Sequence, residues 1–168
     1  TFNKKRKKVF PFFENYKLIE VMTYSSPYWS LSPYCLKDEN ERIHENIWQG
    51  SKWYPSVPYS HQTYSRYNRR VIWEHPEEKH MDENGEPNEK YWAWREKLMN
   101  NQDAVRYPVT FDRKARTSCI CSIWNGKRYN YIEARKEIYM KEYARLVKKE
   151  KQYKELKQML LHGTNLLI

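Results

Sequence analysis

A carboxylate, an indole and an amine follow one another closely in the segment ENERIHENIWQGSK, residues 39–52. Glu45 stands three residues before Trp48 and seven before Lys52, so a helix over this segment would present all three on one side. An apolar ring beside a carboxyl group limits its contact with water and raises its pKa, which suits a general acid or base. Glu45 is therefore the first candidate catalytic residue, with Trp48 and Lys52 as candidate substrate-binding residues.

The same three residues also have a purely structural interpretation. Glu45 could face solvent and pair with Lys52 or Arg42 on the helix surface. Trp48 could belong to the core, which is the commoner place for a tryptophan. The spacing by itself does not choose between the two interpretations.

A second cluster of chemically useful residues mixes arginines with aromatic rings. The segment RYNRRVIW, residues 66–73, places Arg66, Arg69 and Arg70 close to Tyr67 and Trp73. Guanidinium groups bind phosphates and aromatic rings stack on bases, so the three arginines are candidates for phosphate or nucleic-acid binding. A surface strand that happens to carry arginines would have the same composition, and this alternative stays open.

The overall charge favours acidic partners. The formal net charge is +10 and the isoelectric point is near 9.4, which is typical of proteins that bind nucleic acid or nucleotide phosphates. Part of the excess comes from a run near the N-terminus, which predicts a basic arm over residues 1–15. The candidate phosphate-binding residues of that arm are Lys4, Lys5, Arg6, Lys7 and Lys8. The alternative is that these lysines only keep the terminus in solvent.

Cysteine usage and glycine content exclude several classes of site. Three cysteines, Cys35, Cys119 and Cys121, do not make a disulfide framework, and they predict an intracellular, reducing compartment such as the cytoplasm or nucleus, with a virion or organelle as alternatives. The spacing of Cys119 and Cys121 is not that of a zinc knuckle, so no metal site is predicted.

With only four glycines, neither a Rossmann nor a P-loop nucleotide site is expected, and no cofactor is predicted. No apolar run is long enough for a membrane span.

The first half of the chain predicts a strand, a short helix and a long loop. Residues 16–23 alternate loosely and read as a strand. Asp38, with Glu41 three residues later, predicts a capping box for the helix that carries Glu45. Residues 54–87 are poor in regular signals, which indicates a long insertion with one embedded strand near residues 70–74.

The second half predicts three helices and a hairpin. A helix over residues 88–101 is capped by Asn88, and a strand over residues 119–124 ends in an Asn-Gly turn. Asn130 and Glu133 predict a capping box for a helix that runs to about residue 147, and a further helix over residues 152–161 ends at Gly163. The sequence therefore predicts an α+β fold, a helix-rich single domain over residues 16–168 around a small sheet.

The order of these motifs resembles the NADAR (YbiA-like) family, whose members are known as N-glycosidases that act on ribose-linked substrates such as ADP-ribose conjugates. Three pieces carry the resemblance, and together they span most of residues 28–168: LSPYCL (31–36) leading to ENIWQGSK (45–52), YWAWREKLM (91–99), and the leucine-rich segment 153–168 with its closing strand. The resemblance implies that Glu45 corresponds to the family's helix glutamate and Trp92 or Trp94 to its pocket tryptophan. A later acidic residue of the family has no counterpart, and the apolar run that stops at Ile168 suggests that the natural chain continues as a strand.

These observations predict an N-glycosidase-like domain that binds a nucleotide or ADP-ribose conjugate. Breaking a ribosyl N-glycosidic bond builds positive charge on the sugar, which a carboxylate such as Glu45 can stabilise. Trp92 or Trp94 would hold the leaving base, and Lys52 or Arg95 would bind phosphate. The competing hypothesis is a non-catalytic basic component of a nucleoprotein particle, such as a viral capsid or an organellar ribosome, that contacts nucleic acid or particle proteins through its N-terminal arm.

Overall fold

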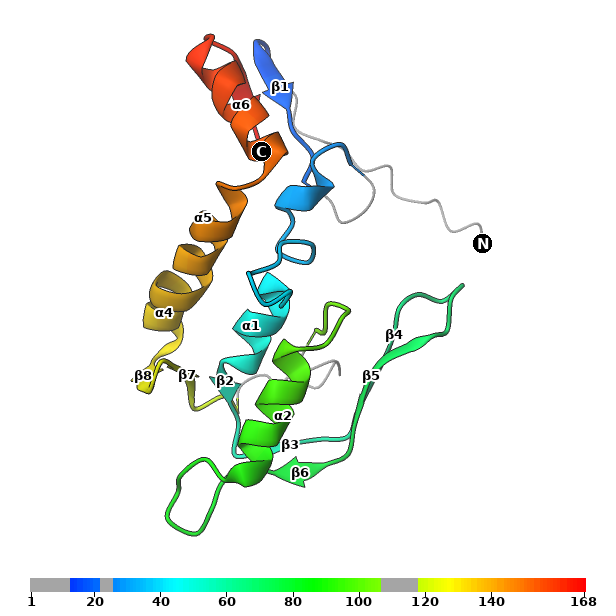
Figure 1. Cartoon of the computed structure of the whole chain (residues 1–168), viewed down its shortest axis with the longest axis vertical. Coiled ribbons are helices and arrows are strands. Elements are labelled where there is room, and N and C mark those ends of the chain that lie inside the picture. Colours follow the sequence, from blue (N-terminus) through cyan, green and yellow to red (C-terminus); the bar gives the residue numbers. More distant parts are fainter. Residues whose placement is uncertain (1–12, 22–25, 107–117) are drawn as a thin grey trace, which may run out of the picture.

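The computed structural model describes residues 13–21, 26–106 and 118–168. Helices and short paired strands are distributed along an elongated molecule, which confirms the predicted α+β class (Figure 1). The basic run at residues 4–8 lies outside the described residues. Within them, none of the helices is both long enough and apolar enough to cross a membrane.

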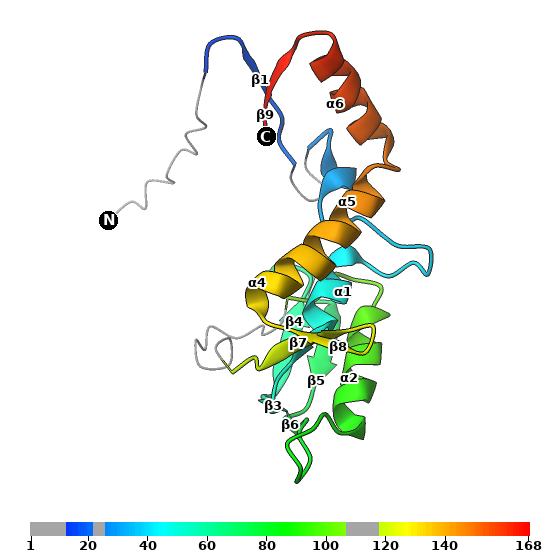
Figure 2. The ribbon, with the colours of Figure 1, turned by 90° about the vertical axis from the view of Figure 1, so that its left-hand side faces the viewer.

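Two helices pack against each other in the half of the molecule opposite the C-terminal helix (Figure 2): α1 (His44–Gly50) and α2 (Glu89–Met99). Their close approach depends on Gly50, because a Cβ atom there would lie 2.7 Å from Cγ of Met99. The predicted start of α2 is confirmed, since the Asn88 side chain accepts a hydrogen bond from the backbone N–H of Tyr91.

The predicted capping box of α1 is wrong. Oδ1 of Asp38 accepts hydrogen bonds from the backbone N–H groups of Asn40 and Arg42, and Oδ2 pairs with the Arg42 guanidinium at 2.7 Å. Both carboxylate oxygens of Asp38 are therefore engaged in a turn that precedes the helix. The helix begins only at His44, six residues after Asp38.

A three-stranded antiparallel sheet follows α1, with the order β2 (Lys52–Trp53), β7 (Cys121–Trp124) and β8 (Lys127–Tyr129). The predicted Asn-Gly hairpin is confirmed, because Asn125 and Gly126 have φ angles of 48° and 73°, as a type I′ turn requires. Lys52 is the first residue of β2, so the prediction that it shares the helix of Glu45 is wrong.

Residues 54–87 are more ordered than the sequence predicted. The expected strand is present as β5 (Val71–His75), which pairs with β4 (Ser60–Thr63), and β3 (Ser56–Val57) pairs with β6 (Glu78–Lys79). These strands have two to five residues, which is too short for a clear alternating pattern. They form because pairing buries Val57 and Trp73 in the main core.

One long helical rod follows the hairpin. The capping box of Asn130 and Glu133 is confirmed, since each residue's side chain accepts from the other's backbone N–H. This rod contains a π-helical segment between two α-helical ones, which no sequence pattern indicated. Its parts are α4 (Tyr131–Ala134), the π-helical η2 (Arg135–Met140) and α5 (Lys141–Val147).

The far end of the molecule contains the C-terminal helix α6 (Lys151–Leu161) (Figure 1). Gly163 follows it with a φ of 82°, which confirms the predicted helix end. Strand β1 (Tyr16–Leu18) pairs in parallel with β9 (Asn165–Leu167). The first strand is thus shorter than predicted, and residues 22 and 23 of that prediction lie outside the described residues.

Three apolar clusters hold these elements together. The largest joins the strands to α2, the second joins the single-turn helix η1 (Trp29–Leu31) to α5 and α6, and the smallest joins α1 to η2. The buried members of the largest cluster are Trp53, Tyr54, Val57, Trp73, Tyr91, Trp94, Leu98, Val105 and Ile123. The smallest cluster contains Trp48, Ala134 and Ile138, and it lies beside Glu45.

Candidate active site

Glu45 is a buried carboxylate at the start of a hydrogen-bonded chain. Its side chain lies on α1 and only 6% of the residue is exposed. Oε1 accepts a hydrogen bond of 2.6 Å from Nε2 of Gln49, and Oε1 of Gln49 accepts one of 2.8 Å from Nζ of Lys52. One amide side chain therefore connects the acid to the amine.

The segment before α1 brings Tyr34 to this acid. The backbone N–H of Glu45 donates to the carbonyl of Pro33, and that of His44 donates to the carbonyl of Leu36. These bonds fix the turn that carries Tyr34 against the first turn of the helix. Burial, and then the charge of Glu45, raise the pKa of Tyr34.

A second cation, Arg106, reaches the site through a clamp made by Asn46. The Asn46 side chain donates to the carbonyls of Asn101 and Asp103 and accepts from the backbone N–H of Val105. The next residue, Arg106, places its guanidinium 4.9 Å from the centre of the Tyr34 ring. A buried amide next to Glu45 in the sequence thus positions a cation from a distant segment.

The π-helical segment supplies the third cation and another ring. The guanidinium of Arg135 lies 4.5 Å from the ring centre of Tyr139 and 5.9 Å from that of Trp48. Tyr139 also meets the Trp48 ring edge to face, with centres 5.5 Å apart. Wide helical turns of this type are often found at functional sites.

Burial and charge act on the pKa of Glu45 in opposite directions. Burial is the largest influence and raises the pKa, while the hydrogen bond from Gln49 and the charges of Lys52, Arg106 and Arg135 lower it. The net shift is upward. Burial also lowers the pKa of Lys52, and the charge of Glu45 opposes that shift. The acid is thus held away from water but surrounded by positive charge.

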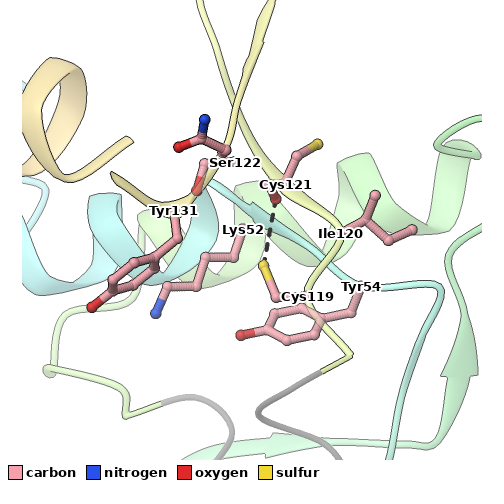
Figure 3. Close-up of a pocket in the computed structure, with 8 residues that line it drawn as sticks. Lys52, Tyr54, Cys119, Ile120, Cys121, Ser122 and Tyr131 are labelled. Carbon is pink, nitrogen blue, oxygen red and sulfur yellow. Dashed lines mark hydrogen bonds between the residues drawn. The ribbon is translucent and has the colours of Figure 1, made fainter. Parts of the chain in front are cut away.

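Lys52 links this network to a cavity of about 330 Å³. Figure 3 shows its side chain between the ring of Tyr131 and Cys119. Glu45 is not among the residues that line this cavity, and hydrogen bonds through Gln49 and Lys52 connect it to the cavity. The complete lining consists of Lys52, Tyr54, Cys119, Ile120, Cys121, Ser122, Asn130 and Tyr131.

Trp48 does not offer a free ring to a substrate. It is buried in the smallest apolar cluster, and Nζ of Lys52 lies 4.7 Å from its ring centre. The structure thus places Trp48 in the core, as the structural interpretation expected, and its role as a candidate substrate-binding residue stays a prediction. Its indole instead packs against the cationic groups of Lys52 and Arg135.

The tryptophans of α2 lie apart from Glu45. Trp94 is 1% exposed inside the largest core cluster, so its predicted role as a pocket residue is wrong. Trp92 is 45% exposed and lies 5.5 Å from the guanidinium of Arg95. Trp92 and Arg95 line another cavity, of about 540 Å³, whose wall includes neither Glu45 nor Lys52. The structure does not bring Trp92 and Arg95 together with the candidate acid.

The three candidate arginines of the second cluster lie at the tip of the β4–β5 hairpin. Arg66, Arg69 and Arg70 are all exposed there, together with Tyr67. They are remote in the chain from Glu45 and none of them lines the cavity at Lys52.

Thiols and histidines do not assemble into a metal centre in the part of the chain that the structure describes. None of the three cysteines forms a disulfide, and Sγ of Cys119 donates to the carbonyl of Cys121 at 3.5 Å. Burial raises the pKa of both Cys119 and Cys121, so neither is an activated nucleophile.

Comparisons with protein-family models, with curated proteins and with solved structures each gave no significant match. The relation to the NADAR family thus stays a prediction. Function must be argued from the site itself.

Sequence reasoning missed several members of the site. Gln49 carried a signal, because it stands four residues after Glu45 on the same helix. Arg106 and Arg135 carried none, since only the folding of distant segments brings them to Glu45. The same holds for the rings of Tyr34 and Tyr139.

Proposed function

We propose that this chain is an N-glycosidase-like domain that hydrolyses a ribosyl N-glycosidic bond in a nucleotide or ADP-ribose conjugate, as the NADAR resemblance implies. The observation that carries the proposal is the buried Glu45, joined by Gln49 to Lys52 in a cavity wall. Perturbed acids beside a concave site are typical of catalytic groups.

The chemistry requires one carboxylate and one water molecule. As the bond between C1′ of the ribose and the base nitrogen breaks, its electron pair leaves with the base, which takes up a proton. Positive charge then develops on the sugar, and the ionised carboxylate of Glu45, linked to the cavity wall through Gln49 and Lys52, stabilises it by its charge. Water adds to C1′ and gives up the proton that the base takes, so the products are the free base and the free ribose end.

Cations around the acid suit a phosphorylated substrate. Lys52, Arg106 and Arg135 all act on the carboxylate of Glu45 through their charge. A phosphate or diphosphate beside the ribose would be attracted by the same groups. The cavity volume of about 330 Å³ lies within the range of small-molecule sites. The exposed ring of Tyr131 at the cavity wall is the best candidate to stack on the leaving base, in the place first assigned to the α2 tryptophans.

The absence of a disulfide between the three cysteines favours a reducing compartment as the place of action. We expect no membrane partner and no metal requirement for this reaction.

The test is Glu45→Gln, assayed by chromatographic release of base or ADP-ribose from a panel of nucleotide and ADP-ribose conjugates. We expect the wild-type chain to act on at least one conjugate and the variant to lose activity at least about 100-fold. The matched control is Glu155→Gln on the exposed face of α6, which should keep full activity. Equal activity of Glu45→Gln and wild type, or no release from any conjugate, would overturn the proposal.

Stability measurements separate catalysis from folding in the same variant. Since burial raises the pKa of Glu45, its ionised form is less favourable in the folded chain than in the unfolded one. The contribution of Glu45 to stability is complete below its unfolded pKa and is lost as pH rises. At neutral pH, Glu45→Gln should therefore melt at the wild-type temperature or above. A large drop would mark Glu45 as structural.

A further inference from the structure

The β4–β5 hairpin carries chemistry that the proposed reaction does not use. Its loop, residues 64–70, contains three arginines, two tyrosines and no acidic residue. Figure 1 shows the hairpin extending sideways from the helices, away from α6 and from the rod of α4 and α5. The loop is therefore presented to solvent at an extremity of the molecule.

The rings at this tip are unusually open for tyrosines. Tyr67 is 85% exposed, and Tyr64 is about half exposed. The guanidinium of Arg66 lies 4.8 Å from the ring centre of Tyr67, and that of Arg70 lies 5.7 Å from the ring centre of Tyr64. Cations and stacking faces thus alternate along one short loop.

The loop is held in shape by its own polar groups. Oγ of Ser65 accepts from the backbone N–H groups of Tyr67 and Asn68, and Oδ1 of Asn68 accepts from the N–H of Arg70. The backbone N–H of Tyr64 donates to the carbonyl of Arg70 and closes the turn. A prepared loop loses less conformational freedom when it binds a partner.

Charge at the tip is only partly neutralised. Arg70 pairs with Asp103 at 2.9 Å. Arg66 and Arg69 have no acidic partner within 4 Å among residues 13–21, 26–106 and 118–168. The nearest acid on the hairpin itself, Glu74, accepts a hydrogen bond from Tyr59 at the hairpin base. Two guanidinium groups without an acidic partner in the described part of the chain therefore stand on either side of the exposed Tyr67 in the sequence.

We propose that this hairpin tip binds single-stranded nucleic acid, with Tyr67 stacking on a base and Arg66 and Arg69 contacting adjacent phosphates. A single strand fits because its bases are free to stack on a ring, and duplex bases are not. The site is separate from the cavity at Lys52, and its function does not depend on the glycosidase chemistry.

The experiment measures fluorescence anisotropy of the whole chain with labelled oligouridylate and oligothymidylate of about 12 nucleotides, and with a duplex of the same length. Titrations at about 50 and 200 mM salt give the salt dependence. We expect both single strands to bind more tightly than the duplex. Absence of single-strand binding at the lower salt would overturn the proposal.

Matched variants locate the binding. Arg66→Gln with Arg69→Gln should weaken binding at least about 10-fold and reduce the logarithmic salt slope by about 1.4. The control, Lys154→Gln with Lys157→Gln, removes the same charge from exposed positions on α6 at the far end of the molecule. If the control loses as much affinity as the tip variant, the attraction belongs to the overall charge and the proposal fails.

The stacking ring has its own test. Tyr67→Ala should weaken binding about 10-fold, and Tyr67→Phe should bind nearly as the wild type, because stacking needs the ring and not the hydroxyl. Wild-type affinity of Tyr67→Ala would overturn the role of Tyr67. Glu45→Gln should bind normally, so failure of the glycosidase proposal and failure of this one give different results.

Discussion

Two regions of this chain combine cations with aromatic rings, and their surroundings differ. At α1 the cations of Lys52 and Arg135 lie over a tryptophan that is sealed in an apolar cluster. At the hairpin tip, Arg66 lies over a tyrosine that is almost fully open. The same pair of chemical groups thus occurs once inside the protein and once on its surface.

The difference shows what burial adds to the chemistry. Inside, burial shifts the pKa of Glu45 upward and that of Lys52 downward, and a buried polar atom without a partner costs stability. Outside, charges stay solvated, so they attract a polyanion without much effect on folding. The buried region is suited to a reaction and the exposed region to binding.

The largest expected effect comes from deleting one ring in each region. Trp48→Ala removes a buried indole and should lower the free energy of unfolding by about 3–5 kcal/mol. Tyr67→Ala removes an exposed ring and should change it by no more than about 0.5 kcal/mol. Chemical denaturation of both variants makes the measurement. Similar losses for both would break the distinction between the two regions.

A somewhat smaller effect concerns His44, a fully buried histidine beside Tyr139 and Tyr143. Burial lowers its pKa to about 4, and neither ring nitrogen has a hydrogen-bond partner among the described residues. Between pH 6.5 and about 4 the unfolded chain binds a proton that the folded chain does not. The free energy of unfolding should therefore decrease as the pH is lowered through this window, by roughly 3 kcal/mol from this residue.

The variant His44→Phe keeps a ring and removes the titration. Denaturation at a series of pH values should show a shallower loss of stability in acid than for the wild type. Some acid sensitivity should persist, because burial also lowers the pKa of His75 and His80. His162→Gln, on the exposed end of α6, is the control and should follow the wild-type curve. An unchanged slope in His44→Phe would contradict the expectation.

The smallest effect sharpens the role of Gln49. Its hydrogen bond lowers the pKa of Glu45, so Gln49→Ala should move the acidic limb of the pH–rate profile to higher pH. Loss of this hydrogen bond should cost only about 1 kcal/mol of stability. The measurement is the rate of product release at a series of pH values. A limb that stays in place would show that Gln49 does not tune the acid.

Local signals in the sequence predicted several parts of the fold correctly. The cap of Asn88, the capping box of Asn130 and Glu133, and the turn at Gly126 each depend on bonds or dihedral angles within a few residues. The prediction that Asp38 caps α1 was wrong, because its carboxylate accepts hydrogen bonds within a local turn that precedes the helix. Apart from β5, the short strands in residues 54–87 were missed because only their partners stabilise them.

By itself, the sequence determined the α+β class, the excess of positive charge, the acid at position 45 and the arginine-rich loop that contains Tyr67. Only the tertiary structure decided which of these groups meet. It placed Arg106 and Arg135 beside Glu45 and sealed Trp94 in the core, because contacts between distant segments depend on packing and not on spacing along the chain.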